Sequence, residues 1–460
     1  MKIKYLRAAF RWTEVITLRR RAFSLLFLIV ATSAYSQQSF TLKEAVQYAL
    51  KNHITVKNAE LEIYSAENTI KQVKAAGMPQ ISGQFQYTAN VIVPTQLVDA
   101  KNFNPQAAEG EVVKFKFGVP WGGQAGLGVN QLIFDATWLV GLKAAPVYRE
   151  LAQRTVTSSK VAVAENVMKA YYSVLVAEER SKILGLNISR LDTLLREIKI
   201  MNEKGFVEKL DVDRLQVQRN NLVTETIKVQ NLIQLSYGLL KFQMGIKQQE
   251  SISLKDKLSE TDVNMLQLPE YQGVDYGNRI EYSTLMTQRK LTTLDIERIQ
   301  KGALPKVFFS GSLGAGHSNP RFNPFERWFG SSALSLGVQI PIYDSGLRKI
   351  QVQQQNINLT KIDQSALLLR ESFELQASQG IISLKNGLET LKSQKANMEL
   401  ATEVVRVSKI KYQAGAGTNI EVVNAESSLK EAQTNYFAAL YDLLIAKVDL
   451  DKAMGKLLAE

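Results

Sequence analysis

Two long stretches that are almost free of helix-breaking residues constrain this chain more than any other feature. Residues 137–204 contain one proline, Pro146, and residues 346–412 contain none. Because proline and glycine commonly end helices, each stretch predicts one helix of about 100 Å. A short glycine-containing turn and another helix follow each stretch, over 211–244 and 421–457. The chain is therefore predicted to form two long helical hairpins.

Apolar residues on these helices recur at alternating steps of four and three, which is the spacing of a coiled coil. A stripe of this kind packs against a neighbouring helix, and the polar positions stay in water. A further helix is predicted over 42–76, because Thr41 and Glu44 match a capping box at its start. The two clearest stripes are Leu184, Ile188, Leu191, Leu195 and Ile198, and Ala425, Leu429, Ala432, Tyr436, Ala439, Leu443 and Ala446.

Four shorter segments alternate apolar and polar residues with a period of two, which is typical of strands with one hydrophilic face. A half-buried soluble sheet gives the same pattern. We interpret the segments as transmembrane strands, because aromatic residues at their ends suit the two membrane interfaces. The strands are predicted over 81–93, 123–134, 306–316 and 332–343. The interfacial aromatics are predicted to be Phe134 and Tyr343 at one end, and Trp121, Trp328 and Phe329 at the other.

Residues 1–36 predict a secretory signal peptide, which supports the membrane interpretation. Three arginines, Arg19 to Arg21, precede an apolar stretch over 22–34. A single membrane anchor is the alternative, although the stretch is shorter than the ~20 residues of a spanning helix. Half of the net charge of +12 lies in this segment, so basicity alone does not indicate nucleic-acid binding.

The chain also repeats its own motifs. Residues 127–135 (LGVNQLIFD) match residues 336–344 (LGVQIPIYD) at an offset of 209 positions, and Gly205 corresponds to Gly415. The first hairpin loop is longer than the second by about 17 residues. An internal duplication follows, since each half reads helix, strand, loop, strand, long helix, turn and helix. The predicted division is a first repeat over 37–246, a linker over 247–277 and a second repeat over 278–460.

The order of elements resembles the TolC family of outer-membrane efflux channels over residues 38–457. The motifs that carry the resemblance are the opening segment 40–50, the helix-to-strand joints at 77–81 and 303–307, and the turn region 412–426. The resemblance implies a membrane α+β fold, in which a trimer forms a twelve-stranded outer-membrane barrel continued by a periplasmic helical tunnel. The number of strands also favours a trimer. Four strands from one chain cannot close a barrel in lipid, and the eight strands of a dimer leave an interior filled by side chains.

The resemblance further implies a passive exit duct, in the cell outer membrane, for a tripartite efflux or type I secretion system. Its partners would be a periplasmic adaptor, an inner-membrane pump of the RND or ABC type, and outer-membrane lipid. The alternative is a periplasmic coiled-coil scaffold or adaptor that binds without conducting. An enzyme is not predicted, because the chain has no cysteine, two histidines and no phosphate-binding motif. No catalytic residue, cofactor, metal site or nucleic-acid partner is predicted.

Two turns and a set of nearby polar residues are the predicted functional sites. The resemblance implies that the turns meet the adaptor and that the polar residues form a periplasmic gate, with a hydrogen bond from Tyr412 to Asp211. Glu421 and Asn424 occupy positions where some members carry lumen-facing aspartates, and Gly417 occupies the place of an arginine. Glu421 also suits a solvated helix start. The predicted turn residues are Gly205, Phe206, Val207, Gly415, Ala416 and Gly417.

Overall fold

The computed structural model describes residues 38–116, 118–258 and 273–458. The predicted signal peptide over 1–36 therefore lies outside the described residues. The chain divides into two compact units, and each draws on three separate stretches of sequence. Of the described residues, the helical unit contains 38–54, 162–258 and 380–450, and the sheet unit contains the rest. The division into two repeats and a linker stays a prediction.

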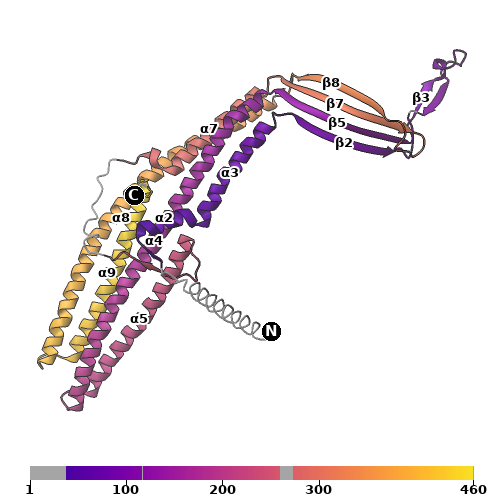
Figure 1. Cartoon of the computed structure of the whole chain (residues 1–460). Coiled ribbons are helices and arrows are strands. Elements are labelled where there is room, and N and C mark those ends of the chain that lie inside the picture. Colours follow the sequence, from indigo (N-terminus) through magenta and orange to yellow (C-terminus); the bar gives the residue numbers. More distant parts are fainter. Residues whose placement is uncertain (1–37, 117, 259–272, 459–460) are drawn as a thin grey trace, which may run out of the picture. The chain divides into compact units, whose positions relative to one another are not determined.

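The two predicted long helices and their following helices are confirmed (Figure 1). Helix α4 continues through Pro146, and α4 and α8 each contribute residues to both units. Among the described helices, none combines the length and the apolar character needed to cross a membrane. The four helices are α4 (Ala136–Glu203), α5 (Lys209–Met244), α8 (Leu347–Gln413) and α9 (Asn419–Ala453).

The helix predicted over 42–76 is wrong in one respect, because it is two helices, α2 (Leu42–Asn52) and α3 (Ile54–Ala75). The capping box at its start is confirmed, since Thr41 Oγ1 accepts from the Glu44 amide at 3.2 Å. The break lies at His53, whose backbone is extended. A Cβ added to Gly245, the C-cap of α5, would lie 3.2 Å from His53 Cα. The break therefore lets the C-terminal end of α5 come close to the backbone at His53.

The predicted apolar stripes form the core of the helical unit. Leu191, Leu195 and Ile198 of α4 are buried with Leu215 and Leu222 of α5. On α9, Ala425 and Leu429 are buried against α8. The heptad spacing therefore identified the buried faces correctly.

A pair of short parallel strands, which the sequence did not reveal, lies in the helical unit. Strand β1 (Gln38–Phe40) pairs with β6 (Ile252–Leu254). Strand β6 lies within the segment predicted to be a linker. The Asp256 carboxylate accepts hydrogen bonds from the Tyr171 hydroxyl and the Leu42 amide, each at 2.8 Å. These contacts fix the start of α2 against α4.

The four predicted strands form one antiparallel sheet in the sheet unit, in the order β2-β5-β7-β8 (Figure 1). Strand β8 ends earlier than predicted, because Pro341 has no amide hydrogen for a ladder bond. The longer first loop folds as a second hairpin, which was not predicted. The bounds are β2 (Gln80–Ala89), β5 (Trp121–Phe134), β7 (Lys306–Asn319) and β8 (Phe329–Gln339) in the sheet, and β3 (Thr95–Asp99) and β4 (Val112–Lys116) in the second hairpin.

The main helices of this unit are α3, α7 (Ile280–Lys301) and the sheet-unit parts of α4 and α8. Ion pairs link them, with Nη2 of Arg149 3.0 Å from Glu67 and Nζ of Lys143 3.0 Å from Glu297. Asp135 begins α4 by accepting from the Thr137 amide at 2.7 Å. Short 3-10 helices occur at Ala100–Asn102 and Tyr276–Asn278.

Candidate functional site

Cross-strand register gives the sheet one hydrophilic face. Ser82 of β2 pairs with Gly128 of β5, which pairs with Ser312 of β7. Directly paired residues share a face, and the neighbouring row lies on the other face. The predicted alternation is therefore confirmed by the pairing itself. The residues that line this hydrophilic face include Ser82, Gln84, Gln124, Asn130, Ser310, Ser312, Ser331 and Ser335, none of which is charged.

The opposite face of the sheet is apolar and open to its surroundings. Ile81 is 72% exposed, Leu334 79% and Leu336 68%. Ile81, Val129, Gly311 and Leu334 form one cross-strand row on this face. A contiguous exposed apolar surface of this kind is typical of contact with lipid or with another protein.

Two of the predicted interfacial aromatics belong to one cluster near the β7–β8 loop. The Trp121 ring lies 4.9 Å from the Phe322 ring, and the Trp328 ring stacks on His317 at 5.4 Å. Tyr87 joins the cluster, with its ring centroid 6.1 Å from those of both Trp121 and His317. Their interfacial role stays a prediction.

The other three aromatics differ in where the register places them. Phe134 pairs with Val307 on the apolar face, while Tyr343 lies beyond β8 and is 85% exposed. Phe329 pairs with Gly316, which pairs with Gln124, so Phe329 belongs to the hydrophilic face. An interfacial role for these three aromatics stays a prediction.

The turn between α4 and α5 is built by backbone geometry at Gly205. Its φ is +79°, a conformation that favours glycine. The Phe206 amide donates to the Met201 carbonyl at 2.9 Å, as in a Schellman motif. Asn202 supports the turn by donating to the Val207 carbonyl at 2.7 Å. The Phe206 side chain is left 78% exposed at the turn.

The turn between α8 and α9 uses its two glycines for different reasons. Gly415 has a φ of +73°, and the Ala416 amide donates to the Lys411 carbonyl at 2.9 Å. Gly417 has little space around it, since a Cβ there would lie 3.0 Å from Lys411 Cβ. Ala416 is exposed. Both predicted turns are therefore confirmed as turns, and their docking role is untested.

Tyr412 and Asp211 do not form the hydrogen bond that the family resemblance implies. The Tyr412 hydroxyl is buried and has no hydrogen-bond partner among the described residues. Asn419, which is 3% exposed, donates instead to the Asp211 carboxylate at 3.0 Å and to its carbonyl at 2.8 Å. Burial, and then the negative charge of Asp211, raise the pKa of Tyr412. The sequence did not single out Asn419.

Glu421 and Asn424 lie on an exposed side of α9, while Val422 and Ala425 are buried. The Thr418 hydroxyl donates to the Glu421 carboxylate at 3.1 Å, at the first turn of the helix. This contact is what a helix-start residue makes, and exposure also leaves the carboxylate available to a lumen.

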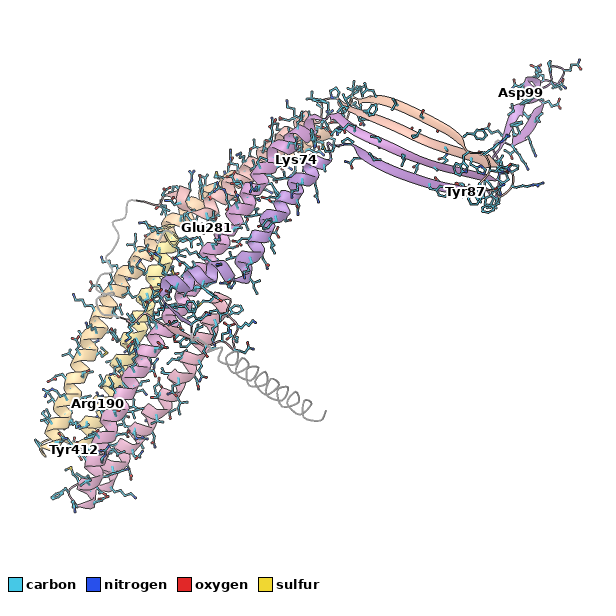
Figure 2. All side chains as sticks on the ribbon, viewed as in Figure 1. Lys74, Tyr87, Asp99, Arg190, Glu281 and Tyr412 are labelled. Atoms are coloured by element: carbon cyan, nitrogen blue, oxygen red, sulfur yellow. The ribbon has the colours of Figure 1, made fainter. Side chains whose placement is uncertain are left out.

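A buried polar network, which sequence reasoning missed, joins the two helical hairpins. Arg190 of α4 donates to both carboxylate oxygens of Glu426 of α9, at 3.0 and 2.9 Å. Glu426 is 4% exposed. Asn187 donates to Gln433 at 2.6 Å in the same layer. Figure 2 labels Arg190 and Tyr412 toward the end of the helical unit where the turns lie. The hairpins are therefore held together by charge as well as by apolar packing.

Comparison with known proteins gives the same picture from independent information. The family model described as outer membrane efflux protein matches residues 288–456. Outer membrane protein TolC of Escherichia coli (strain K12) is 19% identical over 440 residues, covering 91% of this chain and 83% of that protein. Cobalt-zinc-cadmium resistance protein CzcC of Cupriavidus metallidurans is 20% identical, and the match covers 90% of each chain.

Solved structures agree on the fold. A CusC structure superposes with a TM-score of 0.71 at 13% identity, covering 90% of this chain and 92% of that chain. The outer membrane protein VceC of Vibrio cholerae gives 0.67 at 14% identity, covering 90% and 96%. The predicted family resemblance is therefore confirmed.

Proposed function

We propose that this chain, which is similar to outer membrane efflux proteins over most of its length, is the outer-membrane exit duct of a tripartite export system. The observation that carries this proposal is the hydrophilic face of a four-stranded sheet whose other face is apolar. A sheet of this kind suits a barrel wall with water on one side and lipid on the other. The relatives are outer membrane efflux proteins rather than enzymes, and we infer no catalytic role.

We propose that three copies assemble, with internal duplication supplying two hairpins of the barrel per chain. Among the residues that the structure describes, the outer strands β2 and β8 each have one edge that pairs with no other strand. Unpaired backbone groups are costly in lipid, so the edges must pair between chains. Three copies give a barrel of twelve strands, wide enough for an aqueous channel.

The duct is passive in this proposal, and its partners supply the energy. A periplasmic adaptor would contact the turns at Gly205–Val207 and Gly415–Gly417, and an inner-membrane pump of the RND or ABC type would load the duct. Exposed Phe206 supports this docking role, because an unburied phenylalanine at a tip is a suitable anchor for a partner.

The helical end near the turns would act as the periplasmic gate. Tyr412, Asp211, Glu421 and Asn424 lie in this region, and the Asn419–Asp211 bond supplies the link that the resemblance assigned to Tyr412. Glu421 from three chains would form a ring of carboxylates that concentrates cations. Asn424 is neutral, so we expect a single charged ring.

The test is the behaviour of detergent-purified protein. We expect a trimer by native mass measurement, and ion conductance when the trimer is inserted in a planar bilayer. In the same recordings, Glu421→Gln should lower cation selectivity. A monomer that does not conduct would favour the alternative, a periplasmic scaffold or adaptor. Conductance with unchanged selectivity in Glu421→Gln would instead place Glu421 outside the conduction path.

A further inference from the structure

One cross-strand row near the β7–β8 loop places an aromatic ring on the hydrophilic face. Gln86, Gln124, Gly316 and Phe329 pair in sequence across β2, β5, β7 and β8. Phe329 is 65% exposed, so its ring stands free on this face. It lines a hollow of about 430 Å³ together with Gln86, Thr88, Gln124, Ser318 and the buried His317.

Gly316 leaves an open slot between Gln124 and Phe329. Neighbouring strands lie about 4.8 Å apart, so the amide and the ring are separated by roughly twice that distance. A Cβ added to Gly316 would meet nothing within 4 Å, and its φ is not in the left-handed region. Neither packing nor backbone strain therefore requires glycine here. By contrast, a Cβ at Gly314 would lie 2.9 Å from the Ala125 carbonyl, so that glycine has a structural reason.

The chemistry of the slot selects for a particular kind of molecule. Gln86, Gln124, Thr88 and Ser318 carry amides and hydroxyls that both donate and accept hydrogen bonds, and none is charged. One aromatic face stands beside four such polar side chains. A ligand that matches this set has a flat apolar face and a rim rich in hydroxyl groups, and it carries no net charge. A sugar ring has this form.

We propose that this slot is a binding subsite for a neutral sugar ring, which stacks on Phe329 and hydrogen-bonds to Gln124 and Gln86. The inference rests on the proposed channel, because the channel would bring solutes to this face. The proposed ligand class, and the residues that would bind it, are additional to the proposed channel function. The subsite is open and shallow, so binding should be weak and reversible, as passage through a duct requires.

The test is direct binding of maltotriose to detergent-purified protein, followed by saturation-transfer NMR. Loss of one stacked ring should weaken binding by about two- to tenfold in Phe329→Ala. Phe329→Tyr should retain binding. Gly316→Val should abolish it by filling the slot, and a β-branched residue suits a strand. The matched control is Phe325→Ala, which removes a 93% exposed ring from the adjacent β7–β8 loop and should change nothing.

Two results would overturn the subsite. One is the absence of saturation transfer from the wild-type protein to maltotriose. The other is binding that is equal in the wild type, Phe329→Ala and Gly316→Val. The binding measurement does not depend on ion flow. A protein that conducts ions but does not bind maltotriose therefore refutes the subsite alone. A protein that does not conduct refutes the proposed function, whatever the sugar binds.

Discussion

Glu426 and Tyr412 are buried polar side chains at one end of the helical unit, and they differ in how their polar atoms are satisfied. Both oxygens of Glu426 accept from Arg190, whereas the Tyr412 hydroxyl has no partner among the described residues. Removing one half of a buried ion pair leaves an uncompensated charge. Removing an unpartnered hydroxyl relieves a desolvation cost. The two positions should therefore respond to mutation in opposite directions.

Glu426→Ala should destabilise the protein by about 2–3 kcal/mol, below the range for fully buried pairs because Arg190 is one-third exposed. Glu403→Ala is the matched control, since its pair with Arg406 is more than half exposed on both sides. That control should cost less than about 1 kcal/mol. Urea unfolding followed by circular dichroism measures both. Equal costs for the two variants would contradict a buried network.

Tyr412→Phe should be neutral or stabilising by about 1 kcal/mol at neutral pH. Burial and the charge of Asp211 raise the pKa of Tyr412 above the ordinary value of about 10. The folded state therefore holds this proton more tightly, and stability is lost as pH rises above about 10. A phenylalanine side chain does not titrate, so the variant should lose less stability there. Thermal unfolding from pH 8 to pH 11 measures this difference, and a destabilised variant at neutral pH would indicate a hidden hydrogen bond.

At the residue scale, motif matching located the right neighbourhood but not the right contacts. It brought Tyr412 and Asp211 to the same end of the helices, and it missed Asn419 and Glu426. The pair of Arg190 and Glu426 spans 236 positions in sequence. Because no local pattern encodes a partner at that distance, the sequence alone does not distinguish this buried carboxylate from a solvated one.

At the element scale, a glycine mutation in a helical turn has two effects that are hard to tell apart. It can distort the turn itself, and it can remove contact with a partner. Replacing Gly415 or Gly417 perturbs a left-handed backbone or a close contact, so lost export in those variants has a structural explanation. Phe206 has neither constraint, because its side chain is 78% exposed. It is therefore the cleaner probe of adaptor docking.

Phe206→Ser should reduce export at least several-fold while leaving the trimer and its melting temperature unchanged, since the ring contributes contact area only to a partner. Phe103→Ser is the control, because it removes a ring of similar exposure, 63%, at the end of the 3-10 helix Ala100–Asn102 in the sheet unit. Export assays in cells and melting curves of purified protein decide between the outcomes. Undiminished export in Phe206→Ser would argue against docking at this turn.

Elements with a long periodic pattern could be predicted from sequence, and elements set by distant contacts could not. The helices α4 and α8 and the four sheet strands follow from breaker-free runs and period-two alternation. The break at His53 has no proline or glycine beside it, and it coincides with the approach of Gly245 from α5. The β3–β4 hairpin lies in a loop whose residues carry no clear period.

At the scale of the whole molecule, the account depends on which face of the sheet meets the conducted solution. Ser312 and Leu313 are adjacent on β7, both are exposed, and the register places them on opposite faces. The chain contains no cysteine, so a single introduced thiol is labelled uniquely. This pair therefore compares the two faces at one height in the sheet.

The most direct test is single-channel recording of Ser312→Cys and Leu313→Cys before and after treatment with a charged, water-soluble methanethiosulfonate reagent. We predict that the reagent lowers the conductance of Ser312→Cys in a stepwise manner and leaves that of Leu313→Cys unchanged, because lipid covers the second thiol. Block of Leu313→Cys with no effect on Ser312→Cys would contradict the account, because the hydrophilic face would not line the channel.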